Sequence, residues 1–410
     1  MILTAETVHP GTIHAEVNSA FLSLVRYAFP GQDILLMAEA QHIGAVRACL
    51  PAADTHISFR AFRRGFVSRL FYWPYKIAGE WLRICAVIRQ ARKRRPELLV
   101  WTALFPTGLW LLQLLIPLLL KKQRQLILLH GELEYFNETM RRPAERALRF
   151  FLRSGLNRAG KQTRFIVFSD SIKAELSALH LRCMERVFVL PHPYDYGYDT
   201  AAGQPSKQQA PADADDVPTH THAAASVQNR EALALGTFGA LGANKNVHLI
   251  FRLAENLRDL IAEGKITVHA AGKCPPEVRA GNAAGLVTLH QPDAFLPRQD
   301  FEAIIAQLDL ALFFYDNTAY RFCASGAVHE AIRLGIPVLA LKNNYFTWLM
   351  RQEAVGKLFD DIAGMEHFIR GVADGTRTGE VAAMRARVRH FRQANSLQAQ
   401  SRGLRDIAAW

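Results

Sequence analysis

The chain has 410 residues, a length that suits two or three domains of roughly 100 to 200 residues each. Half of the residues are hydrophobic and 21% are charged, which excludes global disorder, collagen and coiled coil. The formal net charge of +12 indicates an anionic partner: nucleic acid, a phosphate-bearing small molecule or an anionic membrane surface. The five cysteines lack C-x-x-C spacing, so we expect neither disulfides nor a zinc site. The N-terminus shows no secretory pattern, and a cytoplasmic protein is predicted.

Strand-like and helical patterns alternate along both halves of the chain. The predicted strands are 1–4, 33–37, 98–103, 125–130, 164–169 and 186–191 in the first half, and 232–238, 265–271, 285–290, 308–314 and 337–341 in the second. Continuous apolar strands between helices indicate parallel sheets that are covered on both faces. We therefore predict an α/β protein with two Rossmann-like domains that face each other across a cleft.

The predicted domain boundaries follow the composition. Residues 1–195 form the first domain and residues 230–375 the second. Residues 196–229 between them are a linker, because their small, polar and proline-bearing composition buries too little apolar surface to offset the entropy of ordering. Residues 376–410 are C-terminal helices that are expected to pack back toward the first domain.

Residues 60–95 carry most of the net charge. This segment holds eleven basic residues and one acid, Glu80, interleaved with Phe, Tyr and Trp, and its apolar residues recur at helical spacing from Ile77 to Ile88. A basic, aromatic, amphipathic segment is typical of an interfacial membrane anchor. The alternative is a solvated helix face with an ordinary core stripe, and the sequence leaves both interpretations open.

Residues 98–120 contain no charge and are long enough to span a bilayer. The sequence Pro106-Thr107-Gly108 interrupts this run. We therefore predict a short strand followed by a buried helix of about a dozen residues rather than a membrane span.

Polar groups follow the strand that ends near residue 130. His130, Glu132 and Glu134 come together in the sequence HGELEYF. If the reaction needs a base to remove a proton from a hydroxyl group, an ionisable side chain must lie beside the reacting centre, which makes His130 and Glu132 candidates. The competing interpretation is that His130 only orients a loop.

Two segments of the second half have the features of a phosphate site. The strand ending at Phe238 runs into a glycine-bearing loop from Gly239 to Lys245 and then a helix. Glycines allow close backbone approach, a helix N-terminus offers free N–H groups, and Lys245 adds a positive charge. A second helix is predicted to start at Ser325, a residue type that favours the N-cap, so that the two N-termini flank one diphosphate.

The order of these parts resembles the GT-B fold glycosyltransferases, and in particular glycosyltransferase family four, which uses nucleotide-sugar donors. The resemblance rests on the Gly-x-x and Lys245 opening of the second domain, on HAAGK at 269–273, and above all on HEAIRLGIPVLAL at 329–341. VLPHP at 189–193 and LLHGE at 128–132 are similar to the family's hinge strand and its first-domain His loop. The family's usual glutamate eight positions before Glu330 is Phe322 here.

The resemblance implies a set of site residues. Donor-binding residues would be Glu330 on the ribose hydroxyls, with Gly239, Lys245, Ser325 and Gly326 on the diphosphate. The cation that usually accompanies the lysine is missing from 238–242, and Lys273 or Arg321 would supply it instead. His130 would contact the transferred sugar. In such enzymes the loop at 7–18 lies at the cleft floor, which makes His14, Glu16 and Asn18 candidates.

The predicted function is sugar transfer from a nucleotide-sugar donor, UDP- or GDP-linked, to an acceptor that we expect to be a lipid-linked saccharide of bacterial surface polysaccharide. The resemblance implies hexosyl transfer with retention and without a metal ion; under inversion, Glu132 or Glu16 becomes the base candidate. Localisation is predicted at the cytoplasmic side of the inner membrane, through residues 60–95. The alternatives are a GT-B scaffold without catalysis and a protein that binds an anionic surface or nucleic acid, with nucleic acid the least favoured partner.

Overall fold

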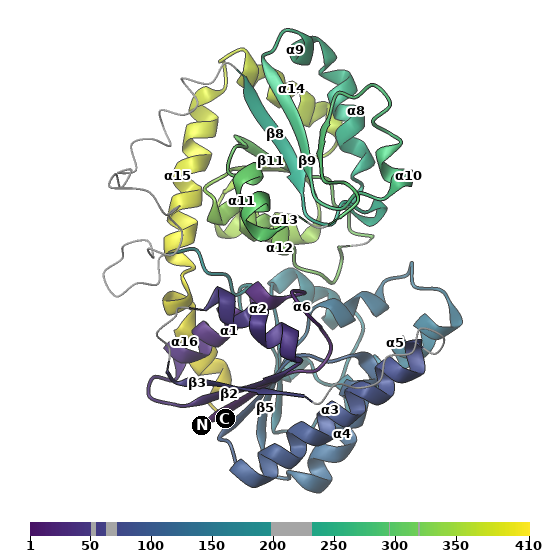
Figure 1. The fold of residues 1–410 in the computed structure, drawn as a ribbon, viewed down its shortest axis with the longest axis vertical. Coiled ribbons are helices and arrows are strands. Elements are labelled where there is room, and N and C mark those ends of the chain that lie inside the picture. Colours follow the sequence, from purple (N-terminus) through teal and green to yellow (C-terminus); the bar gives the residue numbers. More distant parts are fainter. Residues whose placement is uncertain (51–54, 63–71, 198–231, 295, 319) are drawn as a thin grey trace. The chain divides into compact units, whose positions relative to one another are not determined.

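The structure, a computed structural model, describes residues 1–50, 55–62, 72–197, 232–294, 296–318 and 320–410. The chain divides into two compact units (Figure 1). The first unit comprises Met1–Asp195, Arg321–Ala324 and Leu397–Trp410, and the second comprises Tyr196–Tyr320 and Ser325–Ser396. Except for Tyr196 and Gly197, the linker predicted at 196–229 lies outside the described residues, as do residues 63–71 of the predicted membrane segment.

The first unit is built on a parallel sheet with the strand order β3-β2-β1-β4-β5-β6-β7. Its strands are β1 (Ile2–Glu6), β2 (Ile34–Ala38), β3 (Ile57–Ala61), β4 (Leu98–Ala103), β5 (Arg124–Leu128), β6 (Thr163–Val167) and β7 (Val187–Val189). Side chains alternate between the faces of a strand, so Leu3 and Ala5 enter one core while Ile2 enters the other. Burial on both faces explains the continuous apolar runs in the sequence.

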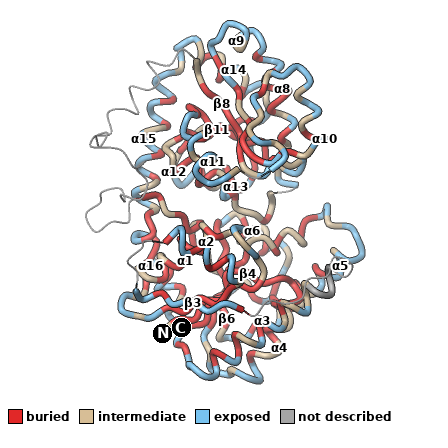
Figure 2. The backbone as a smooth tube through the Cα atoms, viewed as in Figure 1, coloured by how far each residue is buried: buried red, intermediate tan, exposed pale blue. Residues whose placement is uncertain are grey.

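Helices cover both faces of this sheet, and Figure 2 shows the buried residues gathered between the sheet and these helices. One face carries α3 (Tyr72–Arg94), α4 (Pro106–Leu119), α5 (Pro143–Arg158) and α6 (Asp170–Ser177). The other carries α1 (Ala15–Ala28), α2 (Ala40–Cys49) and α16 (Leu397–Ala408). Short 3-10 turns at Gly131–Phe136 and Met184–Arg186 connect the later strands.

The second unit repeats the architecture with the strand order β10-β9-β8-β11-β12-β13, again with parallel pairs. The strands are β8 (Leu233–Phe238), β9 (Ile266–Ala271), β10 (Thr288–His290), β11 (Leu310–Phe313), β12 (Val338–Leu341) and β13 (Gly356–Phe359). The helices are α8 (His248–Asn256), α9 (Arg258–Ala262), α10 (Pro276–Arg279), α11 (Arg298–Ile305), α12 (Gly326–Arg333), α13 (Asn344–Gln352), α14 (Ile362–Ala373) and α15 (Thr378–Ala394). Between β8 and α8, residues Ala243–Lys245 form a 3-10 turn, so the first full helix starts two residues later than the sequence indicates.

The prediction of two Rossmann-like parallel-sheet domains is confirmed as a fold class. The C-terminal piece predicted at 376–410 is divided: α15 belongs to the second unit, whereas α16 belongs to the first and lies against α1. The uncharged run at 98–120 forms β4 and α4, as predicted. Within the described ranges, no helix combines the length and the apolar character needed to cross a membrane.

Candidate functional site

In each unit, polar side chains gather at the topological switch point of the sheet, where successive strands change from one side of the first strand to the other. In the first unit this point lies between β1 and β4, and in the second unit it lies between β8 and β11. Parallel sheets bind ligands outside the carboxyl ends of their strands at such a switch point. The residues around these two places are therefore described as the candidate site of each unit.

Glu6, the last residue of β1, is the hub of the first unit's site. Its carboxylate accepts hydrogen bonds from the backbone N–H of Val8 (2.7 Å) and His9 (3.0 Å), from the Asn18 amide (3.1 Å) and from the Thr102 hydroxyl (3.1 Å). Burial raises the pKa of Glu6, but the hydrogen bond and the electrostatic interaction with the His9 ring, together with the backbone N–H groups of His9 and Val8, outweigh burial and lower the pKa to about 2. A buried carboxylate is thereby kept ionised at neutral pH.

Aromatic rings stack beside this carboxylate. The ring centroids of His9 and His14 lie 4.2 Å apart, those of His14 and His130 lie 4.7 Å apart, and His130 continues to Phe168 at 5.8 Å. Phe168 in turn lies 4.8 Å from the ring of His192. The structure thus brings together two of the predicted catalytic residues, His14 and His130, from loops more than a hundred residues apart in the sequence.

Both predicted histidines are neutral at physiological pH. Burial, with the neighbouring His130 and His9, lowers the pKa of His14 to about 2. Burial, with His9, lowers the pKa of His130 to about 4. The Nε2 atom of His130 donates to the backbone oxygen of Thr102 at 3.2 Å, because a carbonyl can only accept. This leaves Nδ1 of His130 as an acceptor nitrogen.

His14 also adopts an unusual backbone conformation. It precedes α1 with φ of 60°, in the left-handed region, and its buried Nδ1 has no hydrogen-bond partner among the described residues. Strained, non-glycine residues of this kind cluster at functional sites. Glu16, the other candidate of this loop, lies half-buried in the first turn of α1, and Asn18 holds Glu6 as described.

Two further buried carboxyls, those of Glu132 and Glu80, lie at the same edge of the sheet. Glu132 accepts from the backbone N–H of His130 at 3.2 Å, and burial raises its pKa to about 8. Glu80 reaches in from α3 and accepts from the backbone N–H of Phe105 at 2.7 Å and from the Thr7 hydroxyl at 3.4 Å. Burial raises the pKa of Glu80 to about 8 as well. One ionised and two protonated carboxyls therefore lie at this edge of the sheet at neutral pH.

In the second unit, the loop after β8 is held close to the loop after β9. Gly239 and Gly272 have φ of 100° and 126°. A Cβ atom on Gly272 would lie 2.1 Å from the backbone oxygen of Gly239, so only glycine permits this approach. The predicted cation Lys273 is the next residue, and its backbone oxygen accepts from the N–H of Leu241 at 2.9 Å.

Lys245 and the start of α12 converge on one tyrosine. The Lys245 ammonium lies 5.5 Å from the ring centroid of Tyr315, and the Ser325 hydroxyl lies 3.4 Å from the Tyr315 hydroxyl. A Cβ on Gly239 would lie 3.7 Å from Nζ of Lys245 and 3.9 Å from Cβ of Ala327 in the first turn of α12. Ser325 occupies the N-cap position of α12, but its side chain makes no capping bond within the described chain, so free N–H groups remain at Gly326 and beyond.

Glu330 lies one turn further along α12 and is almost fully buried. Arg298 of α11 donates to both of its carboxylate oxygens, at 2.9 and 3.0 Å, and Arg333 donates to one of them. Both arginines also contact Glu302. The predicted ribose-binding carboxylate is thus held in a network of two arginines and a second acid.

Arg321, predicted as an additional cation for the diphosphate, belongs to the first unit instead. Its guanidinium donates to the Glu175 carboxylate at 2.6 Å, and a second acid, Glu138, lies 3.7 Å away. The neighbouring Phe322 is fully buried in the first unit's core against Phe136. The position where the resembling family has a glutamate therefore serves packing in this chain.

Several site residues escaped the sequence analysis. Glu6 ends the first apolar strand with an acid, a signal that could have found it. His9 belongs to the loop at 7–18 that the sequence analysis places at the site, although it is not among the candidates named there. Glu80 and Arg298 carry no local signal, because they reach the sites only through the fold.

The sequence matches no family model and no curated protein. Solved structures do resemble the fold over nearly the whole chain. WaaG, a glycosyltransferase involved in lipopolysaccharide biosynthesis, superposes with a TM-score of 0.61 at 14% identity, covering 100% of both chains. HepE of Anabaena in complex with UDP and glucose gives 0.64 at 15% identity, covering 99% of this chain and 98% of that one. The trehalose-6-phosphate synthase OtsA gives 0.61 at 11% identity, covering 100% and 99%.

Proposed function

We propose that this protein, whose chain has the two-domain GT-B fold, is a glycosyltransferase that moves a hexosyl group from a nucleotide-sugar donor. The observation that carries the proposal is the convergence of Gly239, Lys245 and the free N-terminus of α12 at the switch point of the second unit. Backbone N–H groups and a cation in this arrangement suit a diphosphate. The complex of the structural relative HepE with UDP-glucose supports the same class of donor.

The proposed chemistry relies on charge stabilisation. As the sugar–phosphate bond breaks, Lys245, Lys273 and the α12 N-terminus would bind the developing charge on the departing diphosphate, with no metal ion assigned to this role. Glu330 would hold the ribose hydroxyls once these displace Arg298 from its oxygens. Arg321 stays a prediction of the sequence analysis, and its bond to Glu175 makes Lys273 the better second cation.

The histidine stack of the first unit is the proposed place of the transferred sugar and the acceptor. Neutral His130 offers its Nδ1 lone pair to a sugar hydroxyl. Glu132 is protonated at neutral pH, so it suits hydrogen-bond donation better than proton abstraction. This assignment favours retention, in which the acceptor needs no separate protein base; under inversion, Glu16 and His130 would be the base candidates.

The proposed acceptor is a lipid-linked saccharide of bacterial surface polysaccharide, at the cytoplasmic face of the inner membrane. The support is the cation-rich α3–α4 layer of the first unit, together with the likeness to WaaG, which is involved in lipopolysaccharide biosynthesis. The apolar positions from Ile84 to Ile88 on α3 are not available to a membrane, because they pack into the core of the first unit. Membrane contact would therefore use the outer face of α3, which does not pack into the core, together with the neighbouring helix α4.

A thermal-shift panel with UDP, GDP, ADP and their sugars tests the donor proposal. One nucleotide should raise the melting temperature in a concentration-dependent way, because ligand binding to the native state adds to the free energy of unfolding. No shift with any of them would overturn the proposal. Release of the nucleoside diphosphate from the donor that binds, measured with a lipid extract as acceptor, then separates an enzyme from a scaffold that binds without turnover.

A further inference from the structure

A groove runs along the seam where the C-terminal half of α3 lies against α4. Its basal part is a pocket of about 660 Å³ at the ends of both helices, and a second pocket of about 480 Å³ continues it along the seam. The two pockets share Arg92 and Leu119. Since α3 and α4 end at the amino ends of the strands, this groove is separate from the histidine site at the carboxyl ends.

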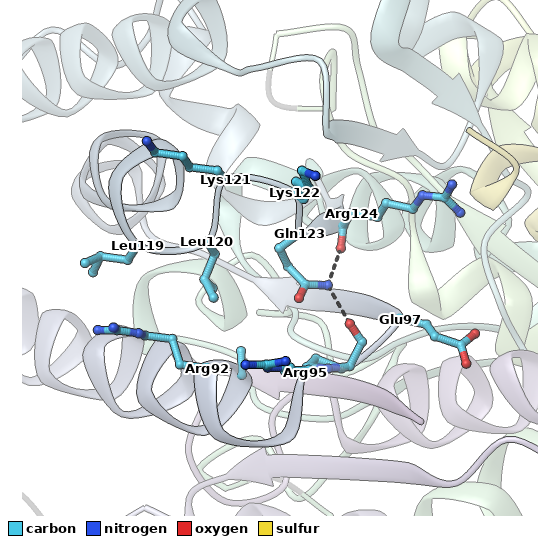
Figure 3. Close-up of a pocket in the computed structure, with 11 residues that line it drawn as sticks. Arg92, Arg95, Glu97, Leu119, Leu120, Lys121, Lys122, Gln123 and Arg124 are labelled. Carbon is cyan, nitrogen blue, oxygen red and sulfur yellow. Dashed lines mark hydrogen bonds between the residues drawn. The ribbon is translucent and has the colours of Figure 1, made fainter.

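The basal pocket is strongly cationic. Five basic residues line it, together with one acid, Glu97, and Figure 3 shows the basic side chains placed around its rim: Arg92, Arg95, Lys121, Lys122 and Arg124. Within the part of the chain that the structure describes, Arg92, Arg95, Lys121 and Lys122 form no ion pair. Arg124 lies 5.7 Å from the ring centroid of Trp410, and the C-terminal dipoles of two helices account for one or two of the other four cations.

The rim of the pocket is fixed by a polar bridge. The Gln123 amide donates to the backbone oxygen of Pro96 at 3.0 Å and to that of Arg124 at 3.1 Å (Figure 3). This bridge ties the segment that follows α4 to the segment that follows α3. The basic residues that these two segments carry therefore lie next to each other around the pocket.

The same helical layer carries most of the large apolar side chains that are exposed among the described residues. Among the described residues, four of the five exposed large hydrophobics lie on α3, α4 and α5: Leu82 (72% exposed), Leu118 (72%), Leu119 (40%) and Phe150 (66%). The second pocket is lined by Ile88, Leu115 and Leu119 beside Arg89, Arg92 and Lys93. Apolar and cationic surface thus alternate within a single groove.

We propose that the α3–α4 groove binds an anionic phospholipid of the membrane, with the phosphate in the basal pocket and the hydrocarbon against Leu119, which lines both pockets, and its exposed neighbour Leu118. Unpaired cations beside exposed leucines complement an amphiphile that carries a negative headgroup. A site for nucleic acid would need the cations but not the exposed leucines. Residues 115–124 contribute as much to this site as residues 89–95 do, so it extends beyond the segment that the charge pattern of the sequence singles out.

Vesicle sedimentation of the full chain without nucleotide tests this proposal. Wild-type protein should bind vesicles of phosphatidylcholine mixed with phosphatidylglycerol and not vesicles of phosphatidylcholine alone. The triple variant Arg92→Gln, Lys121→Gln, Lys122→Gln should bind the anionic vesicles about 100-fold more weakly, since each cation near the surface contributes about 1 kcal/mol. The double variant Leu118→Ser, Leu119→Ser should also bind more weakly while leaving the net charge unchanged.

A matched control removes three exposed cations elsewhere. Lys161→Gln, Arg182→Gln and Arg252→Gln together give the same net charge, and these side chains form no ion pair with a described residue. Equal loss of binding in this control would overturn the proposal, as would absence of wild-type binding or a triple variant that loses DNA binding but keeps vesicle binding. Unchanged melting temperatures of the variants exclude misfolding. Because no donor is present, failure here leaves the proposed glycosyltransferase function intact.

Discussion

Buried acids are the residue-scale feature that most distinguishes the first unit. Glu6, Glu80 and Glu132 lie at the same sheet edge, yet Glu6 is ionised and the other two are protonated at neutral pH. The difference comes from partners: Glu6 accepts four hydrogen bonds at 3.1 Å or less, whereas one oxygen of Glu80 finds no partner among the residues described. A close contact fixes Glu80 in place, because a Cβ on Gly108 would lie 2.4 Å from its carboxyl carbon.

These raised pKa values predict the pH dependence of stability. In the unfolded chain Glu80 and Glu132 release their protons near pH 4.5, but in the folded chain they keep them up to about 8. Between these values the two carboxyls bind more protons in the folded state, so their contribution to the free energy of unfolding falls as the pH rises. The buried histidines His14, His130 and His329 act in the opposite direction below their unfolded value of 6.5. The free energy of unfolding should therefore fall between about 6.5 and 8, by up to a few kcal/mol, and level off above about 8. Glu80→Gln and Glu132→Gln should each flatten this decline in urea unfolding. The exposed Glu185→Gln should reproduce the wild-type slope.

His130 should matter for turnover more than for donor binding. We expect His130→Ala to leave UDP affinity within about twofold and to lower kcat by about 100-fold or more, because the ring belongs to the first unit whereas the proposed diphosphate site belongs to the second. His130→Asn, which keeps a hydrogen-bonding side chain, should recover part of the rate. The exposed His367→Ala is the control. A large loss of UDP affinity in His130→Ala would contradict the assignment.

Glu330 and Glu302 form a matched pair for testing the ribose contact. Both acids bind Arg298 and Arg333, but only Glu330 is expected to meet the ribose. Glu330→Gln should weaken nucleotide binding about tenfold or more in calorimetry, since a charge-assisted hydrogen bond contributes about 1.5–3 kcal/mol. Glu302→Gln should change it much less. Equal losses would show that the arginines, not the carboxylate, decide affinity.

At the scale of elements, the sequence predicts the inner strands and misses two at the edges. β3 and β13 each lie at one end of a sheet, where one edge of the strand stays open. Their sequences, ISFRA and GKLF, mix charged and apolar residues, so they lack the continuous apolar runs of the central strands. The candidate sites follow the same logic: His130 and Lys245 follow recognisable strands, whereas Glu80 is carried to its site by a helix whose pattern indicates only a core stripe.

The approach of the loops after β8 and β9 gives a prediction at this scale. Gly272→Ala should strongly destabilise the second unit and abolish nucleotide binding, because the new Cβ collides with the backbone of Gly239. Gly264→Ala is the matched control, since Gly264 also has a positive φ, of 69°, but nothing lies within 4 Å of its Cβ position among the described residues. The control should cost about 1 kcal/mol in denaturant unfolding and keep nucleotide binding.

At the scale of the whole molecule, the charge and the chain path matter most. A group of cations that form no ion pair with a described residue gathers at the ends of α3 and α4 in the first unit, and the second unit has a few cations at its proposed site. The chain also returns: residues 397–410 complete the first unit's core with Leu397, Leu404 and Ile407 after the second unit has been formed from residues before them. The first unit is therefore discontinuous in sequence.

Truncation after Ser396 tests the importance of this return. Removing 397–410 takes three buried apolar side chains from the core and uncovers α1. Each buried side chain of this kind stabilises a fold by about 1.5–3 kcal/mol, so the truncated first unit should unfold at much lower denaturant or fail to fold. Proteolysis should then cleave first within residues 1–195. Unchanged resistance to protease would contradict this.

The split of the C-terminal helices has a consequence for biosynthesis. A chain emerges from the ribosome N-terminus first, at about 5–20 residues per second. The surface of α1 that α16 covers stays exposed while some two hundred further residues are translated. The first unit, whose chain is synthesised first, therefore completes its fold last. During that interval the nascent chain presents an apolar surface, and a chaperone or the newly made second unit must keep it from aggregating.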